Sequence, residues 1–108
     1  MPTYQCIECK QARSLSLDGA LLLDIRDQNS FMQGHPSSAK NLNNDNAPQL
    51  LSDLSSEQHI LVLCYHGISS KSAAEFISSQ GFNNVASVNG GFEAWQQQFP
   101  EDIKPSSD

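Results

Sequence analysis

Two short, predominantly apolar runs constrain the fold of this chain more than any other feature. Residues 20–25 read ALLLDI, and residues 60–63 read ILVL. Neither run alternates apolar with polar residues, as a strand with one solvent-exposed face would. Continuous runs of this kind are typical of strands buried on both faces, which occur in parallel sheets covered by helices on two sides. The sequence therefore predicts two buried strands of a parallel sheet.

Helical segments alternate with the strands. The clearest helix is predicted over residues 70–80, where two alanines, Phe76 and Ile77 form one apolar face and Gly81 follows as a C′ residue. A last helix is predicted from the spacing of three aromatic residues, Phe92, Trp95 and Phe99. Weaker patterns predict further strands at 4–7 and 85–88, and helices or helical turns at 9–17, 28–33 and 47–54.

This alternation predicts an α/β fold with a mostly parallel central sheet of about five strands, flanked by helices on both faces. The 108 residues are the length of a single domain, which is expected to span residues 1–108. From about residue 100 the chain is polar and carries two prolines, so this end is predicted to be a loose tail.

Charge and hydropathy narrow the class of partner. The net charge is −6 and Lys and Arg together number only 6, so no basic patch is expected for a nucleic-acid backbone. The first ten residues lack the basic and apolar regions of a secretory signal, and no apolar run has the length of a membrane span. The predicted location is the cytoplasm, with neither nucleic acid nor membrane as a partner.

The position of Cys64 suggests chemistry. It follows the strand predicted at 60–63 and precedes the helix predicted from Ser70. Ligands bind at the carboxyl ends of parallel strands, and the free N–H groups of a helix N-terminus stabilise an anion there. This placement predicts a lowered thiol pKa and a nucleophilic thiolate. The alternative is that Cys64 is a small buried core residue.

The loop after Cys64 carries the residues expected to serve that anion. Gly67 allows a tight bend or a close backbone approach. Ser69 or Ser70 is expected to cap the following helix, and Ser72 with Glu75 offers a capping box instead.

Three motifs together resemble the rhodanese family. They are LLLDIRDQNSFMQGH at 21–35, CYHGISS at 64–70 and VNGGFEAWQQQFP at 88–100, in the family's order and spacing. The resemblance covers nearly the whole chain. In its length and in its cysteine loop, the chain is similar to the small single-domain thiosulfate sulfurtransferases.

The resemblance implies sulfur transfer in two steps. The Cys64 thiolate would take the outer sulfur of thiosulfate as a persulfide, and a thiophilic acceptor would remove it. The acceptor that the resemblance implies is cyanide in the test tube, and it is a dithiol or a thioredoxin in the cell. No cofactor and no metal are required. The expected binding residues are those of the loop, with Lys71 as a charge that attracts the donor: Tyr65, His66, Gly67, Ile68, Ser69, Ser70 and Lys71.

Two other functions stay open at this point. Cysteine phosphatases and arsenate reductases of the same fold have a longer loop with an arginine, whereas Ser70 stands six positions after Cys64. Phosphate would lack its bidentate partner there. The second alternative is a non-catalytic module that carries a persulfide. The loop also departs from many rhodaneses, because it contains neither Lys nor Arg; His66 and Lys71 are the nearest sources of positive charge.

Several other motifs are interpreted as structural. Cys6 and Cys9 form a C-x-x-C, but without two further ligands it is weak as a zinc site, and we interpret Cys6 as a buried strand residue and Cys9 as the start of a helix. Asp24 and Arg26 are expected to hold the fold together. We interpret His35 as a residue that orders a loop and His59 as an exposed residue. Residues 89–91 are interpreted as a tight turn from a strand to a helix.

Overall fold

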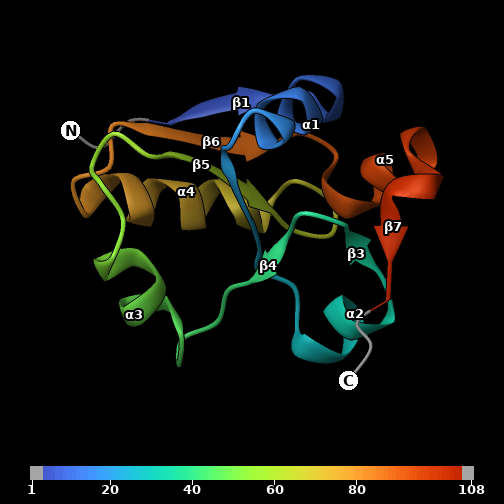
Figure 1. Ribbon diagram of the computed structural model, residues 1–108, viewed down its shortest axis with the longest axis horizontal. Helices are drawn as coiled ribbons and strands as arrows, with labels where there is room; N and C mark the ends of the chain where they lie inside the picture. The colour runs from blue at the N-terminus through green and yellow to red at the C-terminus, as the bar shows by residue number, and fades with distance from the viewer. Residues whose placement is uncertain (1–3, 106–108) are drawn as a thin grey trace.

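The computed structural model describes residues 4–105 and is built around one five-stranded sheet (Figure 1). All four neighbouring strand pairs of this sheet are parallel, so the predicted α/β fold is confirmed. The strands run in the order β1 (Gln5–Ile7), β6 (Asn84–Val88), β5 (His59–Leu63), β2 (Leu21–Asp24) and β4 (Lys40–Asn41).

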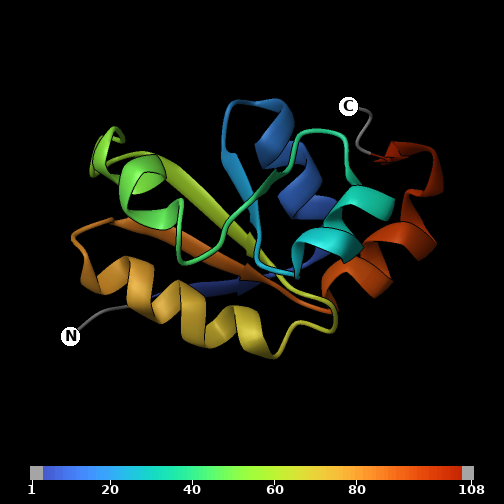
Figure 2. The ribbon, with the colours of Figure 1, turned by 90° about the horizontal axis from the view of Figure 1, so that it is seen from below.

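Helices cover both faces of the sheet, as Figure 2 shows from below. The bounds are α1 (Cys9–Leu17) and α5 (Gly91–Gln98) on one face, and α3 (Ala47–Ser52) and α4 (Ser69–Ser79) on the other. The remaining helix, α2 (Gln28–Gln33), follows β2 and leads into the short strand β3 (His35–Pro36). None of the helices within residues 4–105 is long and apolar enough to cross a membrane.

The central strand β5 is fixed by packing on both of its faces. Successive side chains of a strand point to opposite sides, so Leu61 and Leu63 pack with α1 and α5, while Ile60 and Val62 pack with α3 and α4. All four are at most 1% exposed, and each burial contributes roughly 1.5–3 kcal/mol. The residue that follows β5 therefore starts from a rigid position.

The end of the chain corrects one prediction. Residues 100–104 are not a loose tail, because Pro100–Asp102 form a 3-10 turn and Ile103–Lys104 form β7, which pairs antiparallel with β3. The Trp95 indole N–H donates to an Asp102 carboxylate oxygen at 2.9 Å, which ties this segment to α5. Residues 106–108 lie outside the described part of the chain.

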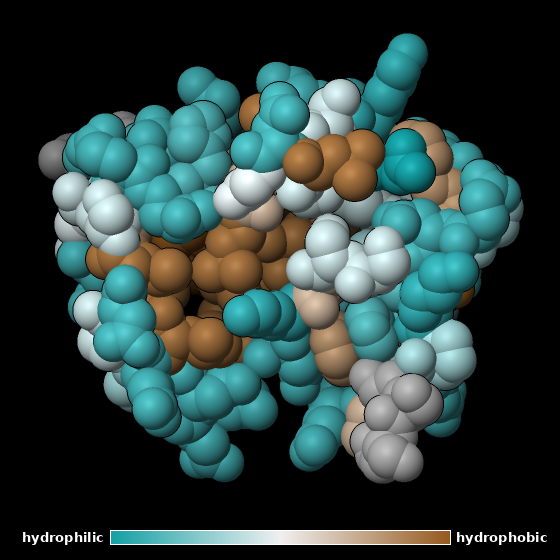
Figure 3. Space-filling model, viewed as in Figure 1, coloured by the Kyte–Doolittle hydropathy of each residue, from teal (hydrophilic) through white to brown (hydrophobic). Residues whose placement is uncertain are grey.

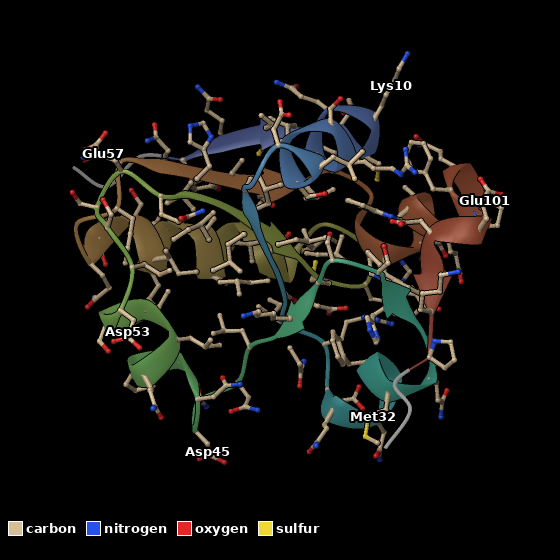
Figure 4. The ribbon with its side chains drawn as sticks, in the orientation of Figure 1. Lys10, Met32, Asp45, Asp53, Glu57 and Glu101 are labelled. Atoms are coloured by element: carbon tan, nitrogen blue, oxygen red, sulfur yellow. The ribbon has the colours of Figure 1, made fainter. Side chains whose placement is uncertain are left out.

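An apolar groove opens between α3 and α4 and is visible as a brown hollow in Figure 3. Leu51, Phe76 and Phe82 are among its lining residues, and its volume is about 590 Å³. Figure 4 shows Asp45 and Asp53 beyond the two ends of α3, while Lys10 projects from α1 at the top of the view. Cys64 does not line this groove.

Candidate active site

Cys64 lies at the carboxyl end of β5, in the middle of the sheet. It directly follows Leu63, the last residue of that strand, and the loop that it begins leads into α4. Cys64 is 5% exposed, whereas Tyr65 is 46% and Ile68 is 74% exposed. The sulfur therefore sits below a rim of exposed loop side chains.

One group of the loop and one side chain of the first turn of α4 contact the sulfur. The Gly67 N–H donates to the Cys64 Sγ at 3.0 Å, and the Ser70 Oγ lies 3.3 Å from the same atom. Burial raises the pKa of the Cys64 thiol. Hydrogen bonds from the Ser70 hydroxyl and from the N–H groups of Ser70, Gly67 and His66 lower this pKa by more than burial raises it. The net pKa of Cys64 lies below that of an ordinary thiol, so the site favours an anionic sulfur.

The N-terminus of α5 holds the loop in this orientation. The Phe92 N–H donates to the Cys64 carbonyl at 2.7 Å, and the Glu93 N–H donates to the Tyr65 carbonyl at 3.0 Å. Because these carbonyls turn toward α5, N–H groups of the loop are free to face the sulfur. Gly91, at φ +59°, makes the approach possible, since a Cβ there would lie 2.4 Å from the Cys64 carbonyl oxygen.

Gly67 packs closely against the turn at residues 89–91, which leads into α5. Its φ is +87°, and a Cβ on it would lie 2.6 Å from the Gly90 nitrogen. The segment at 89–91 is a tight turn, as the sequence predicts, but it also supports the cysteine loop. The sequence pattern gave no indication of that second role, which depends on how α5 packs against the loop.

The other predicted binding residues surround the sulfur unequally. The described hydrogen bonds to the sulfur come from Gly67 and Ser70, with a weaker contribution from the His66 N–H. The His66 side chain lies on the exposed rim, with its Nδ1 3.6 Å from a Glu93 carboxylate oxygen. Lys71 is exposed in the first turn of α4.

The predicted serine cap of α4 is wrong. The helix begins at Ser69, its N-cap residue is Ile68, and no side chain caps it. The Ser70 hydroxyl is instead directed to the sulfur and to the Ser87 hydroxyl, 2.7 Å away on β6. Ser87 is fully buried and was not singled out from the sequence.

Asp24 and Arg26 form a buried ion pair beside the loop. The Arg26 Nε and Nη2 donate to the Asp24 carboxylate at 2.8–3.1 Å, and Nη2 also donates to the Gly34 carbonyl at 2.7 Å. The guanidinium lies 3.7 Å from the centre of the Phe92 ring. This arrangement joins β2, α2 and α5, in agreement with the architectural role expected for the pair.

The C-x-x-C motif is divided between two environments. Cys9 starts α1 as predicted and is buried, and burial followed by the negative charge of Glu8 raises its pKa to about 11. Cys6, however, is exposed rather than buried, because β1 is a three-residue strand at the edge of the sheet. Both thiols are free, and within residues 4–105 no cluster of side chains is arranged to hold a metal ion.

The two remaining histidines lie away from the sulfur. The His35 Nδ1 is 2.8 Å from the Phe31 carbonyl, and its ring stacks on the Phe31 ring, so it orders the turn after α2. His59 is exposed at the start of β5, the opposite end of the strand from Cys64.

Alkylation across a pH series should separate Cys64 from Cys9. The thiolate is the reactive form, so a lowered pKa makes a thiol reactive at lower pH and a raised pKa delays its reaction. With iodoacetamide, we expect the labelling rate of Cys64 to reach its half-maximal value at a lower pH than that of an ordinary thiol. Cys9 should stay unlabelled in the folded protein until the pH nears 11. Peptide mass spectrometry resolves the sites, and labelling of Cys9 before Cys64 would contradict the assignment.

Comparison with known proteins places this site in a family. The Rhodanese-like domain family matches residues 8–98. A Rhodanese-like domain protein from Staphylococcus aureus is 21% identical with a TM-score of 0.78, and the match covers 95% of this chain and 99% of that one. The Rhodanese-like domain of the Anabaena Alr3790 protein is 21% identical with a TM-score of 0.81, over 96% of this chain and 81% of that one.

A longer protein contains the same fold as one part. The reduced CoADR-RHD protein of Bacillus anthracis is 24% identical with a TM-score of 0.79 over 93% of this chain, which spans only 18% of that protein. The family match extends over β2, β4, β5 and β6 of the sheet, the cysteine loop and the turn that supports it. The chain belongs to the family of rhodanese-like domains.

Proposed function

We propose that this protein is a sulfurtransferase that carries sulfur as a persulfide on Cys64. The observation that supports this most directly is the Gly67 N–H at 3.0 Å from the Cys64 sulfur, in a loop whose carbonyls are bound by α5. An inward-facing backbone donor stabilises a thiolate and would stabilise a persulfide anion equally well. The contact between the Cys64 sulfur and the Ser70 hydroxyl acts in the same direction.

Thiosulfate is the proposed donor. The Cys64 thiolate attacks the outer sulfur of thiosulfate, a new S–S bond forms at Sγ, and the bond to the sulfonate sulfur breaks. The electron pair of that bond leaves with sulfite. The step therefore requires no proton transfer, metal ion or organic cofactor. Lys71, exposed beyond the loop, is the proposed charge that draws the dianion toward the site.

A thiophilic acceptor completes the cycle. Cyanide attacks the outer persulfide sulfur, leaves as thiocyanate and returns the Cys64 thiolate. A dithiol or a thioredoxin-type protein is the proposed acceptor in the cell. The reaction needs reduced thiols, which suits the cytoplasm.

Phosphoryl transfer has less support at this site. A phosphatase of this kind uses a guanidinium to bind the phosphate oxygens in a bidentate manner. Ser70 occupies the sixth position after Cys64, is fully buried and turns its hydroxyl toward the sulfur. The buried guanidinium of Arg26 is bound to Asp24.

Mass spectrometry after incubation with thiosulfate tests the proposal. The protein should gain the mass of one sulfur atom, and peptide mapping should place it on the peptide containing Cys64. Cyanide should then remove the added mass and release thiocyanate. Folded protein with a reduced Cys64 that gains no sulfur from thiosulfate would contradict thiosulfate as the donor. Sulfur gained on Cys6 instead would contradict the site.

A further inference from the structure

Ser87 is a polar residue in an apolar position. It lies in β6 between Ala86 and Val88, pairs with Val62 of β5, and is 0% exposed. A hydroxyl buried without a hydrogen bond destabilises the fold, and alanine or valine would pack in such a strand. The Ser87 Oγ lies 2.7 Å from the Ser70 Oγ, which is also 0% exposed.

These two hydroxyls form a chain that ends on the sulfur. The Ser70 Oγ lies 2.7 Å from Ser87 on one side and 3.3 Å from the Cys64 Sγ on the other. Each hydroxyl has a single proton to donate. When Cys64 is a thiol, its S–H donates to Ser70, and the Ser70 proton is available for Ser87. When the sulfur is an anion, the Ser70 proton must point to the sulfur, so the 2.7 Å contact uses the proton of Ser87.

The direction of the chain therefore depends on the charge of the sulfur. In the anionic state, Ser87 donates to Ser70 and Ser70 donates to Cys64, so both dipoles point the same way. Hydrogen bonds aligned in this manner polarise and strengthen one another. Burial of both hydroxyls keeps water from competing for these protons.

We propose that Ser87 is a positioning residue whose hydroxyl holds Ser70 as a hydrogen-bond donor to the sulfur anion of Cys64. Ser87 has no contact with the reacting sulfur and acts only through Ser70. Its role in turnover rests on the proposed sulfur transfer, because the same chain would stabilise a persulfide anion. Its effect on the thiolate does not depend on that function.

The thiolate fraction of Cys64 is the direct measure of this effect. It is obtained from the pH dependence of Cys64 alkylation by iodoacetamide, followed by peptide mass spectrometry. Ser87→Ala should lower the thiolate fraction at pH 7 by about threefold to tenfold, and Ser87→Thr, which keeps the hydroxyl, should restore it. Ser72→Ala, on an exposed position of α4, is the matched control and should leave the profile unchanged.

The double variant separates a positioning role from a packing role. If Ser87 acts through Ser70, then Ser70→Ala with Ser87→Ala should shift the profile no further than Ser70→Ala alone. The other charged groups near the loop, His66, Glu93, Lys71 and the Asp24–Arg26 pair, are the same in every variant. Circular dichroism and urea unfolding check that each variant is folded.

Three results would overturn the inference. They are an unchanged profile for Ser87→Ala, a failure of Ser87→Thr to restore it in a folded protein, and additive shifts in the double variant. None of them depends on sulfur transfer, so the two proposals fail separately. A wild type that takes no sulfur from thiosulfate but shows the Ser87 effect would contradict only the proposed function.

Discussion

Replacing Cys64 by serine should abolish sulfur transfer from thiosulfate to cyanide while the fold stays intact. A serine hydroxyl is not ionised near neutral pH, so the loop would surround a poor nucleophile. We expect kcat/KM to fall by about 10³-fold or more, measured as thiocyanate formed. The serine Oγ retains the contacts with Gly67 and Ser70, so the free energy of unfolding should change by no more than about 1 kcal/mol.

The matched control for this variant is Cys6→Ser. It makes the same change of one atom at an exposed position of the edge strand β1, outside the cysteine loop. Its activity and its unfolding midpoint should equal those of the wild type. A Cys64→Ser protein that keeps more than a tenth of the activity would contradict the mechanism. A large loss in Cys6→Ser would point instead to the C-x-x-C motif.

Replacing Arg26 by alanine should cause the largest loss of stability. The Asp24 carboxylate is 0% exposed and accepts hydrogen bonds from both Nε and Nη2 of Arg26. Without the guanidinium the buried negative charge has no ion-pair partner, and such a loss costs about 3–5 kcal/mol. The Gly34 carbonyl would also lose its donor. Urea unfolding of the variant and the wild type gives the difference.

Two further variants identify the cause of that loss. Arg13→Ala removes the same side chain from a half-buried position beside the Phe99 ring, and should cost about 0.5–1 kcal/mol. Asp24→Asn combined with Arg26→Met removes both charges, and should be more stable than Arg26→Ala alone. Equal losses for Arg26→Ala and Arg13→Ala would show that the ion pair contributes little.

The elements with a strong local pattern could be predicted from the sequence. The apolar runs predicted β2 and β5, because strands buried on both faces are continuously apolar, and the spacing of Ala74 and Ile77 predicted α4. Phe76, which was predicted on the same apolar face, is instead 59% exposed. The two-residue strands β3, β4 and β7 were missed, since a pair of residues carries no periodicity. Cys6 was misplaced because local sequence does not show which strand lies at an edge.

The part of the site that depends on position along the chain could be predicted, whereas the part that depends on tertiary contacts could not. Cys64 could be singled out because it ends a buried strand just before a helix. Ser87 could not, because a serine in a strand becomes part of the site only when β6 lies beside α4 and brings its hydroxyl to Ser70. The support from the Phe92 and Glu93 N–H groups likewise joins segments that are distant in the chain.

The contact between α5 and the cysteine loop has a consequence for the newly made protein. Synthesis proceeds from the N-terminus, so Cys64 leaves the ribosome before the residues at 91–93 that fix its loop. Until they arrive, the thiol has the ordinary pKa of an unfolded cysteine and is mostly protonated at neutral pH. The Cys64 thiol of the nascent chain therefore stays mostly protonated and weakly nucleophilic during synthesis, and the reactive thiolate forms only when the fold is complete.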